Sequence, residues 1–208
     1  MLLKWFLLLS LAFPRLDLVC AHILLIINQI FVKPFSLMKE LNMELFHEYM
    51  KEYRKQLEKG VIKEAYRGLM EYFNALRLYF KKKYPDHSVS GSVYYGYMDM
   101  TYFSFFPKSL KRRKLKIAIV FIHDKFTFEV WLAGYNKNVQ TKYWKLFKES
   151  NWNNYRIPST TKGVDSIMEY ILFDNPDFSD LDTLTKQIER GALKFIEDIE
   201  NFLFNNYK

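Results

Sequence analysis

Hydrophobic and polar positions alternate most clearly over residues 115–134, LKIAIVFIHDKFTFEVWLAG. Apolar residues recur at every second position on both sides of a polar break, HDK, which is the spacing of two β-strands. Asp124 suits the turn because its side chain can bond nearby backbone groups. The stretch therefore predicts a β-hairpin. Ala118, Val120 and Ile122 make the first arm apolar on its second face as well, which predicts a central strand covered on both sides.

Three further stretches carry the spacing of amphipathic helices, with apolar residues three or four positions apart. Residues 43–84 predict a long helical segment that breaks near Gly60 and ends before a proline. Residues 136–149 predict a helix directly after the hairpin, and residues 181–204 predict a C-terminal helix. Helices therefore flank the hairpin on both sides in the chain.

The remaining patterned stretches are candidates for further strands. Residues 88–106 are too aromatic for a loop and too rich in β-formers for a helix, which predicts one or two strands bent at 96–99. The pattern of residues 164–173 is compatible with either a fourth strand or a short helix. Ser179 is expected to cap the C-terminal helix, with Asp182 in the capping-box position. Together the patterns predict an α+β fold, in which a mainly antiparallel sheet of three to five strands packs against a long N-terminal helix and a C-terminal helix.

Residues 1–42 do not share these patterns and form an apolar extension before a single α+β domain at 43–208. The apolar runs are interrupted by Pro14, short of the ~20 residues that a membrane-spanning helix needs. Three interpretations stay open: a signal or membrane anchor through residues 1–32, a helix packed on the domain, and a mistranslated upstream region with Met43 as the true start. The gene sequence would decide among them.

Composition narrows the class of protein without naming a function. The 208 residues suffice for a core without disulfide staples, and a single cysteine excludes an intramolecular disulfide and favours the reducing cytoplasm. The net charge of +8 is unevenly spread. Residues 51–83 hold ten basic and four acidic side chains, whereas residues 165–200 hold three basic and ten acidic ones. This asymmetry suits an acidic partner, a nucleic acid, or attraction between the two segments; a membrane partner applies only if the N-terminal segment is real.

Motifs for catalysis, metals and cofactors are not found in the sequence, so no catalytic residue, metal ligand or cofactor is expected. The four histidines lie in different segments, and His123 beside Asp124 suits either a base with its carboxylate or a turn. Asp99 and Glu129 are carboxylates on predicted strands, an arrangement by which some metal-dependent nucleases hold magnesium. Those nucleases also have a lysine two positions after the glutamate, and here that position is Trp131. A divergent nuclease-like enzyme stays open as an alternative.

A basic connector between the aromatic stretch and the hairpin is the strongest functional hint. Single-stranded nucleic-acid binders combine a cationic groove with aromatic side chains on which bases stack. A solvated loop beside a buried aromatic core explains the same residues. The candidate nucleic-acid-binding residues are Tyr95, Tyr97, Lys108, Lys111, Arg112, Arg113, Lys114 and Lys116.

Several long strings, among them YYGYMDMTYFSFF, SLKRRKLKIAIVFIH and FEVWLAGYNK, carry a resemblance to a known family. The core resembles an uncharacterised bacterial family known only as a domain of unknown function, over about residues 43–203. The resemblance implies domain limits and no activity, cofactor or catalytic residue. We therefore expect a small cytoplasmic accessory or binding protein. The two alternatives are a nucleic-acid-binding protein that uses residues 108–116 and a nuclease-like enzyme. Association with a membrane through residues 1–32 is the alternative location.

Overall fold

The computed structural model of the protein describes residues 33–206, with side chains from Asn42 onward. The three interpretations of the N-terminal extension concern residues 1–32, which lie outside the described residues. By its contacts the chain divides into two compact units, residues 1–64 and residues 65–208. No helix within residues 33–206 combines the length and the apolar character needed to cross a bilayer.

The first two described helices are α3, Lys33–Glu58, and α4, Val61–Lys83. Gly60 lies between them with a φ of 76°. This left-handed backbone conformation costs glycine little, because glycine has no Cβ to clash with the following carbonyl. The predicted break near Gly60 is therefore confirmed.

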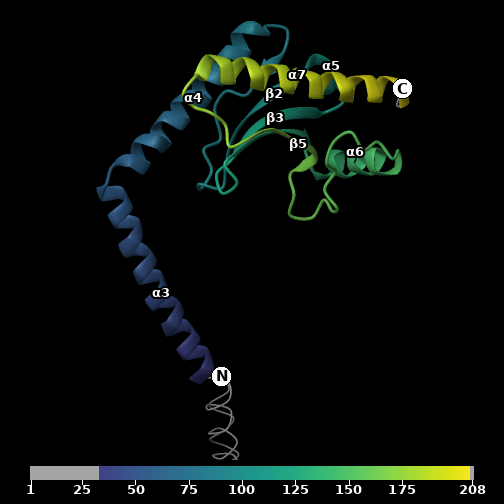
Figure 1. Ribbon diagram of the computed structural model, residues 1–208. Helices are drawn as coiled ribbons and strands as arrows, with labels where there is room; N and C mark the ends of the chain where they lie inside the picture. The colour runs from purple at the N-terminus through teal and green to yellow at the C-terminus, as the bar shows by residue number, and fades with distance from the viewer. Residues whose placement is uncertain (1–32, 207–208) are drawn as a thin grey trace, which may run out of the picture. The chain divides into compact units, whose positions relative to one another are not determined.

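The second unit is built on a five-stranded antiparallel sheet in which each strand pairs with its neighbour in the sequence (Figure 1). The strands are β1 Ser88–Val89, β2 Met100–Phe106, β3 Leu115–Ile122, β4 Thr127–Gly134 and β5 Ser166–Asp174. The predicted hairpin, β3 and β4, lies in the middle of the sheet. The α+β class is confirmed, and residues 164–173, which the pattern left open, enter a strand.

Three more helices complete the second unit: α5 Lys108–Arg112, α6 Lys137–Glu149 and α7 Leu181–Asn206. The capping prediction for α7 is wrong by one residue. The side chain of Asp180, and not that of Ser179, accepts a hydrogen bond from the backbone N–H of Thr183 at 3.0 Å. The backbone N–H of Ser179 instead donates to Asp177 at 2.8 Å, so Ser179 belongs to the preceding turn.

One face of the sheet packs against α4 and α7, and Figure 1 shows α7 lying across it. The ring of Phe73 on α4 stacks on Phe128 of β4 with 5.6 Å between centroids. Phe80, two turns further along α4 on the same face, meets the ring of Phe105 on β2 edge-on at 5.3 Å. From α7, Phe195 is fully buried in the same cluster. Since burying one such side chain is worth about 1.5–3 kcal/mol, this aromatic layer is the main support of the sheet.

A buried carboxylate ties α7 to the end of α4. Glu189 accepts hydrogen bonds from the Tyr79 hydroxyl and from Lys83 Nζ, each at 2.8 Å, and from the Tyr84 hydroxyl. Burial alone would raise the pKa of Glu189, but the bonds from Lys83, Tyr84 and Tyr79 outweigh it and lower the pKa. Glu189 is therefore a charged acceptor held between two helices.

The other face of the sheet carries shorter side chains at its centre. Ala118 and Val120 of β3 are buried there, beside Trp131 of β4 and Tyr102 of β2 in the strand register. Both faces of β3 are thus covered, as its apolar pattern predicts. On this second face the cover comes from larger neighbouring side chains, which leave a hollow between them.

Candidate functional site

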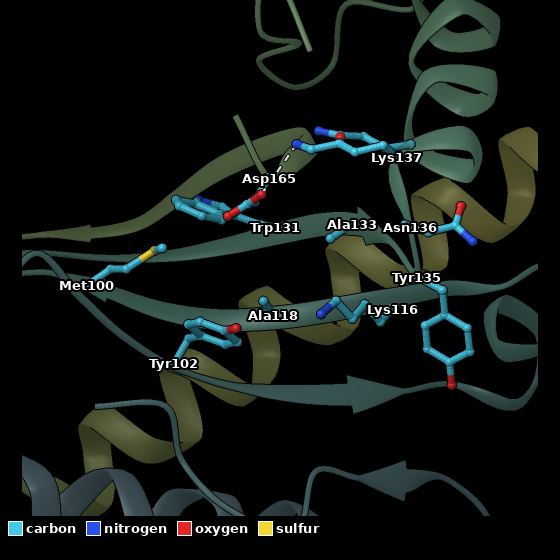
Figure 2. Close-up of a pocket in the computed structure, with 12 residues that line it drawn as sticks. Met100, Tyr102, Lys116, Ala118, Trp131, Ala133, Tyr135, Asn136, Lys137 and Asp165 are labelled. Carbon is cyan, nitrogen blue, oxygen red and sulfur yellow. Dashed lines mark hydrogen bonds and ion pairs between the residues drawn. The ribbon is translucent and has the colours of Figure 1, made fainter. Parts of the chain in front are cut away.

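The hollow on the second face of the sheet is a candidate ligand site. It has a volume of about 280 Å³ and is floored by Ala118 on β3 and Ala133 on β4. Figure 2 shows Tyr102 and Trp131 on either side of Ala118, with Lys116 on the same strand. The two alanines fill less volume than the aromatic side chains beside them, which leaves the space. A cavity of this kind lies near the lower end of the ~300–1,000 Å³ typical of small-ligand sites.

The end of β4 brings the first turn of α6 to the edge of the hollow. A Cβ added at Gly134 would lie 2.6 Å from the backbone nitrogen of Gln140, so only glycine allows this close approach. Asn136 caps the helix by accepting from the backbone N–H of Val139 at 3.0 Å. Because unpaired N–H groups give a helix N-terminus a partial positive charge, the start of α6 adds to the positive potential there.

Gln140 fixes α6 to the loop that precedes β5. Its side-chain nitrogen donates to the carbonyl oxygens of Val164 at 2.8 Å and Ser166 at 2.9 Å. Gln140 is buried, so these bonds lie away from water and are costly to break. The wall of the hollow that α6 provides is therefore held in place.

The charges around the hollow leave one lysine uncompensated. Lys137 Nζ donates to the Val164 carbonyl at 2.6 Å and lies 3.4 Å from Asp165 Oδ1, the contact drawn in Figure 2. The side chain of Lys116 makes no hydrogen bond or ion pair with any residue in 42–206. With one carboxylate and two lysines, the hollow carries a net positive charge, and Lys116 is the cation free to meet a ligand.

Tyr102 supplies a neutral hydroxyl at the opposite wall. Burial raises the pKa of this hydroxyl, and the nearby negative charge of Asp165 raises it further. The hydroxyl therefore stays protonated at neutral pH and can donate to an anionic acceptor. The ring of Tyr94 packs on that of Tyr102 with 4.9 Å between centroids, and this contact restricts the orientation of the Tyr102 ring.

Trp131 forms the facing wall and is oriented by a buried carboxylate. Its Nε1 donates to Glu129 Oε2 at 2.6 Å, and the Thr127 hydroxyl lies 3.3 Å from Glu129 Oε1. Glu129 is therefore a paired, buried residue of β4. Trp131 is only partly buried, so part of its surface stays open to the hollow.

The other carboxylate considered for a nuclease-like centre serves a turn. Asp99 Oδ1 accepts from the backbone N–H of Met100 at 2.7 Å and of Tyr97 at 2.9 Å, and these bonds lower the pKa of Asp99. Within residues 42–206, no cluster of three or more His, Cys, Asp or Glu side chains could hold a metal ion. Asp99 and Glu129 thus have separate, structural partners.

His123 lies in the turn between β3 and β4, next to Asp124. Its Nε2 lies 2.9 Å from the Thr101 hydroxyl, and its backbone N–H donates to the Asp99 carbonyl at 2.9 Å. Burial lowers the pKa of His123, so the ring is mainly neutral near pH 7. These bonds tie the turn to the start of β2.

The structure separates the nucleic-acid candidates into three places. Lys108, Lys111 and Arg112 lie on α5, with Arg113 and Lys114 directly after it; Tyr95 and Tyr97 precede β2 at its other end; Lys116 lies in the hollow. Seven residues of extended strand separate the tyrosines from α5, a span of roughly 20 Å. The stacking residues and the main group of cations are therefore not brought together.

Sequence reasoning missed the walls of the hollow contributed by Trp131, Lys137 and Asp165. One signal was present: the second face of the hairpin alternates large with small residues, Trp131 with Ala133 on one arm and Lys116 with Ala118 on the other. Such a face leaves space. Nothing local, however, indicates that residues around 137 and 165 meet it.

The fold and the hollow define an α+β protein with an antiparallel meander, helices α4 and α7 on one face and a positively charged ligand-sized hollow on the other. The chain belongs to the family described as domain of unknown function DUF7000, whose model matches residues 46–203. The expected membership of an uncharacterised family is thereby confirmed. Comparison with curated proteins found no match, and neither did comparison with solved structures.

Proposed function

We propose that the protein is a small cytoplasmic binding protein that holds a nucleoside monophosphate, or a chemically equivalent planar ring with a phosphate, in the hollow. The observation that carries the proposal is the free Lys116 beside the two aromatic walls, Tyr102 and Trp131. The cytoplasmic location rests on the single cysteine of the chain.

The proposed ligand follows from the chemistry of each wall. A planar heterocycle packs over Ala118 between the rings of Tyr102 and Trp131, where stacking on an aromatic side chain is worth about 1–3 kcal/mol per base. The phosphate meets Lys116 and the positive start of α6, because charge-assisted bonds to phosphate are stronger than neutral ones. Asp165 paired with Lys137 offers an acceptor for a ligand hydroxyl or amine.

Calorimetric titration of the full chain tests this proposal with three kinds of probe: adenosine 5′-monophosphate and the other common ribonucleotides, the parent nucleosides, and inorganic phosphate. We expect a monophosphate to bind more tightly than either its nucleoside or phosphate alone, since only the whole molecule uses both the rings and the cation. Binding of none of the probes at millimolar concentration would refute the proposal.

Two lysine variants separate a specific contact from general charge. Lys116→Gln should weaken monophosphate binding about 10-fold or more, because a hydrogen bond to a charged group contributes roughly 1.5–3 kcal/mol. Lys125→Gln, in the exposed turn between β3 and β4, removes the same charge away from the hollow and should leave binding unchanged. Equal losses in the two variants would show that only net charge matters.

Nucleic-acid binding through the connector is a second proposal, supported by the exposure of Lys108, Arg112 and Lys114 on and after α5. Such binding should weaken with salt, with a log–log slope of about 0.7 per phosphate neutralised on a single strand. Changing these three residues to Ser should lower that slope. Changing the cations at 81–83, at the end of α4, is the control, and an equal effect of both changes would refute a role for the connector.

A further inference from the structure

The apolar side chains of α3 follow a regular spacing along one face of the helix. Five of its apolar residues follow one another at steps of three, four, three and four positions. They are Met43, Phe46, Met50, Tyr53 and Leu57, and we call them the α3 seam. A step that averages 3.5 residues is the heptad spacing by which one α-helix pairs with another along its length.

All five side chains of the α3 seam are exposed, with exposed fractions between 39% and 64%. They run along about 22 Å of helix, at ~1.5 Å per residue over 15 residues. Phe46 and its neighbour Tyr49, which lies three positions further along α3 and beside the seam, are each more than 60% exposed. A continuous apolar stripe of this length is unfavourable in water, and such patches mark interaction surfaces.

The polar side of α3 is already satisfied by pairs within the helix. Lys51 contacts Glu48 at 2.8 Å, and Arg54 contacts Glu58 at the same distance. These pairs lie one turn apart and need no external partner. Whatever covers α3 therefore contacts the seam and leaves the polar side in solvent.

Charge along residues 42–59, the segment that holds the α3 seam, favours a second copy of the same segment. Residues 42–50 contain two acidic and no Lys or Arg residues, whereas residues 51–59 contain four basic and two acidic ones. The halves thus carry about −2 and +2, and the whole segment is neutral. Two copies laid antiparallel place each acidic half against a basic half and oppose their helix dipoles, whereas a parallel pair places like charges together.

We propose that α3 is a homodimerisation element, in which the seams of two chains pack antiparallel. In the heptad register, Phe46 of one copy lies opposite Leu57 of the other, and Met50 lies opposite Tyr53. The family match begins at residue 46, so four of the five seam residues lie within the matched domain.

Light scattering on the purified full chain tests the dimer. The mass should be twice the 25.2 kDa of one chain at tens of micromolar, and added salt should weaken association because the halves attract by charge. Phe46→Glu combined with Tyr53→Glu should give a monomer. The matched control is Leu45→Glu, which charges an exposed apolar residue outside the seam and should leave the dimer intact.

Cysteine cross-linking tests the orientation, in a Cys20→Ser background. Chains with Phe46→Cys mixed with chains with Leu57→Cys should form a mixed disulfide dimer, and neither variant alone should. Self-linking of each variant alone would indicate a parallel pair and overturn the antiparallel arrangement. A monomeric wild-type chain at 100 micromolar, or equal dissociation by the seam variant and Leu45→Glu, would overturn the dimer itself.

Discussion

Replacing Glu189 tests how much of the stability of the second unit depends on one buried carboxylate. Glu189→Leu removes the acceptor for the hydroxyls of Tyr79 and Tyr84 and for Lys83, all of which come from the last two turns of α4 and the residue after it. Leucine is close to glutamate in volume, so the change leaves little empty space. What remains is the loss of the bonds between α4 and α7.

The expected cost follows from the exposure of each donor. Lys83 is half exposed and can return to water, so its contribution is small. The two tyrosine hydroxyls are partly buried and donate to a charged acceptor, a kind of bond worth roughly 1.5–3 kcal/mol each before partial rehydration. We expect Glu189→Leu to lower the free energy of unfolding by about 2–4 kcal/mol. For a chain of this size, each kcal/mol shifts Tm by ~2–4 °C.

Urea denaturation followed by tryptophan fluorescence, at a series of pH values, measures this cost. The pKa of Glu189 is lower in the folded protein than in the unfolded chain, so its contribution is fully present above the unfolded pKa and is lost as pH falls through the folded value. The gap between wild type and Glu189→Leu should therefore be constant near pH 7 and shrink below about pH 4.5. An unchanged midpoint at pH 7, or a gap that persists undiminished to pH 3, would contradict this account.

Three further changes test the fold and the hollow. Val130→Asp places a charge at a fully buried position and should cost several kcal/mol or prevent folding; melting like wild type would show that β4 is not in the core. Gly134→Ala should displace the first turn of α6, lower Tm and weaken ligand binding, whereas Gly91→Ala, with open space around it, should do neither. Deleting residues 1–42 should leave cooperative melting, checked by calorimetry, because every described core residue lies in the second unit.

Much of the second unit could be predicted from local pattern. The alternation at 115–134 predicts two strands with the observed faces, and the aromatic stretch at 88–106 predicts the bend before β2. These features depend on residues a few positions apart, since the strand repeat of two and the helix repeat of 3.6 are properties of the local backbone. Residues 164–173 stayed ambiguous because a short apolar run suits either structure, and pairing with β4 decides for the strand.

The sequence by itself determined the elements, their order and the apolar faces that bury them, because each of these follows from near neighbours along the chain. Only the tertiary structure decided which polar residues meet. Lys116 and Asp165 line one hollow although 49 positions separate them, and they do so because α6 turns back at Gly134 and its Gln140 holds the start of β5. Lys116 is close in the chain to the cations of α5 but is separated from them in the fold. The separation arises because β3 begins between them and places Lys116 on the second face of the sheet. Long-range packing, which the local pattern does not encode, therefore places one of the six cations at 108–116 in the hollow.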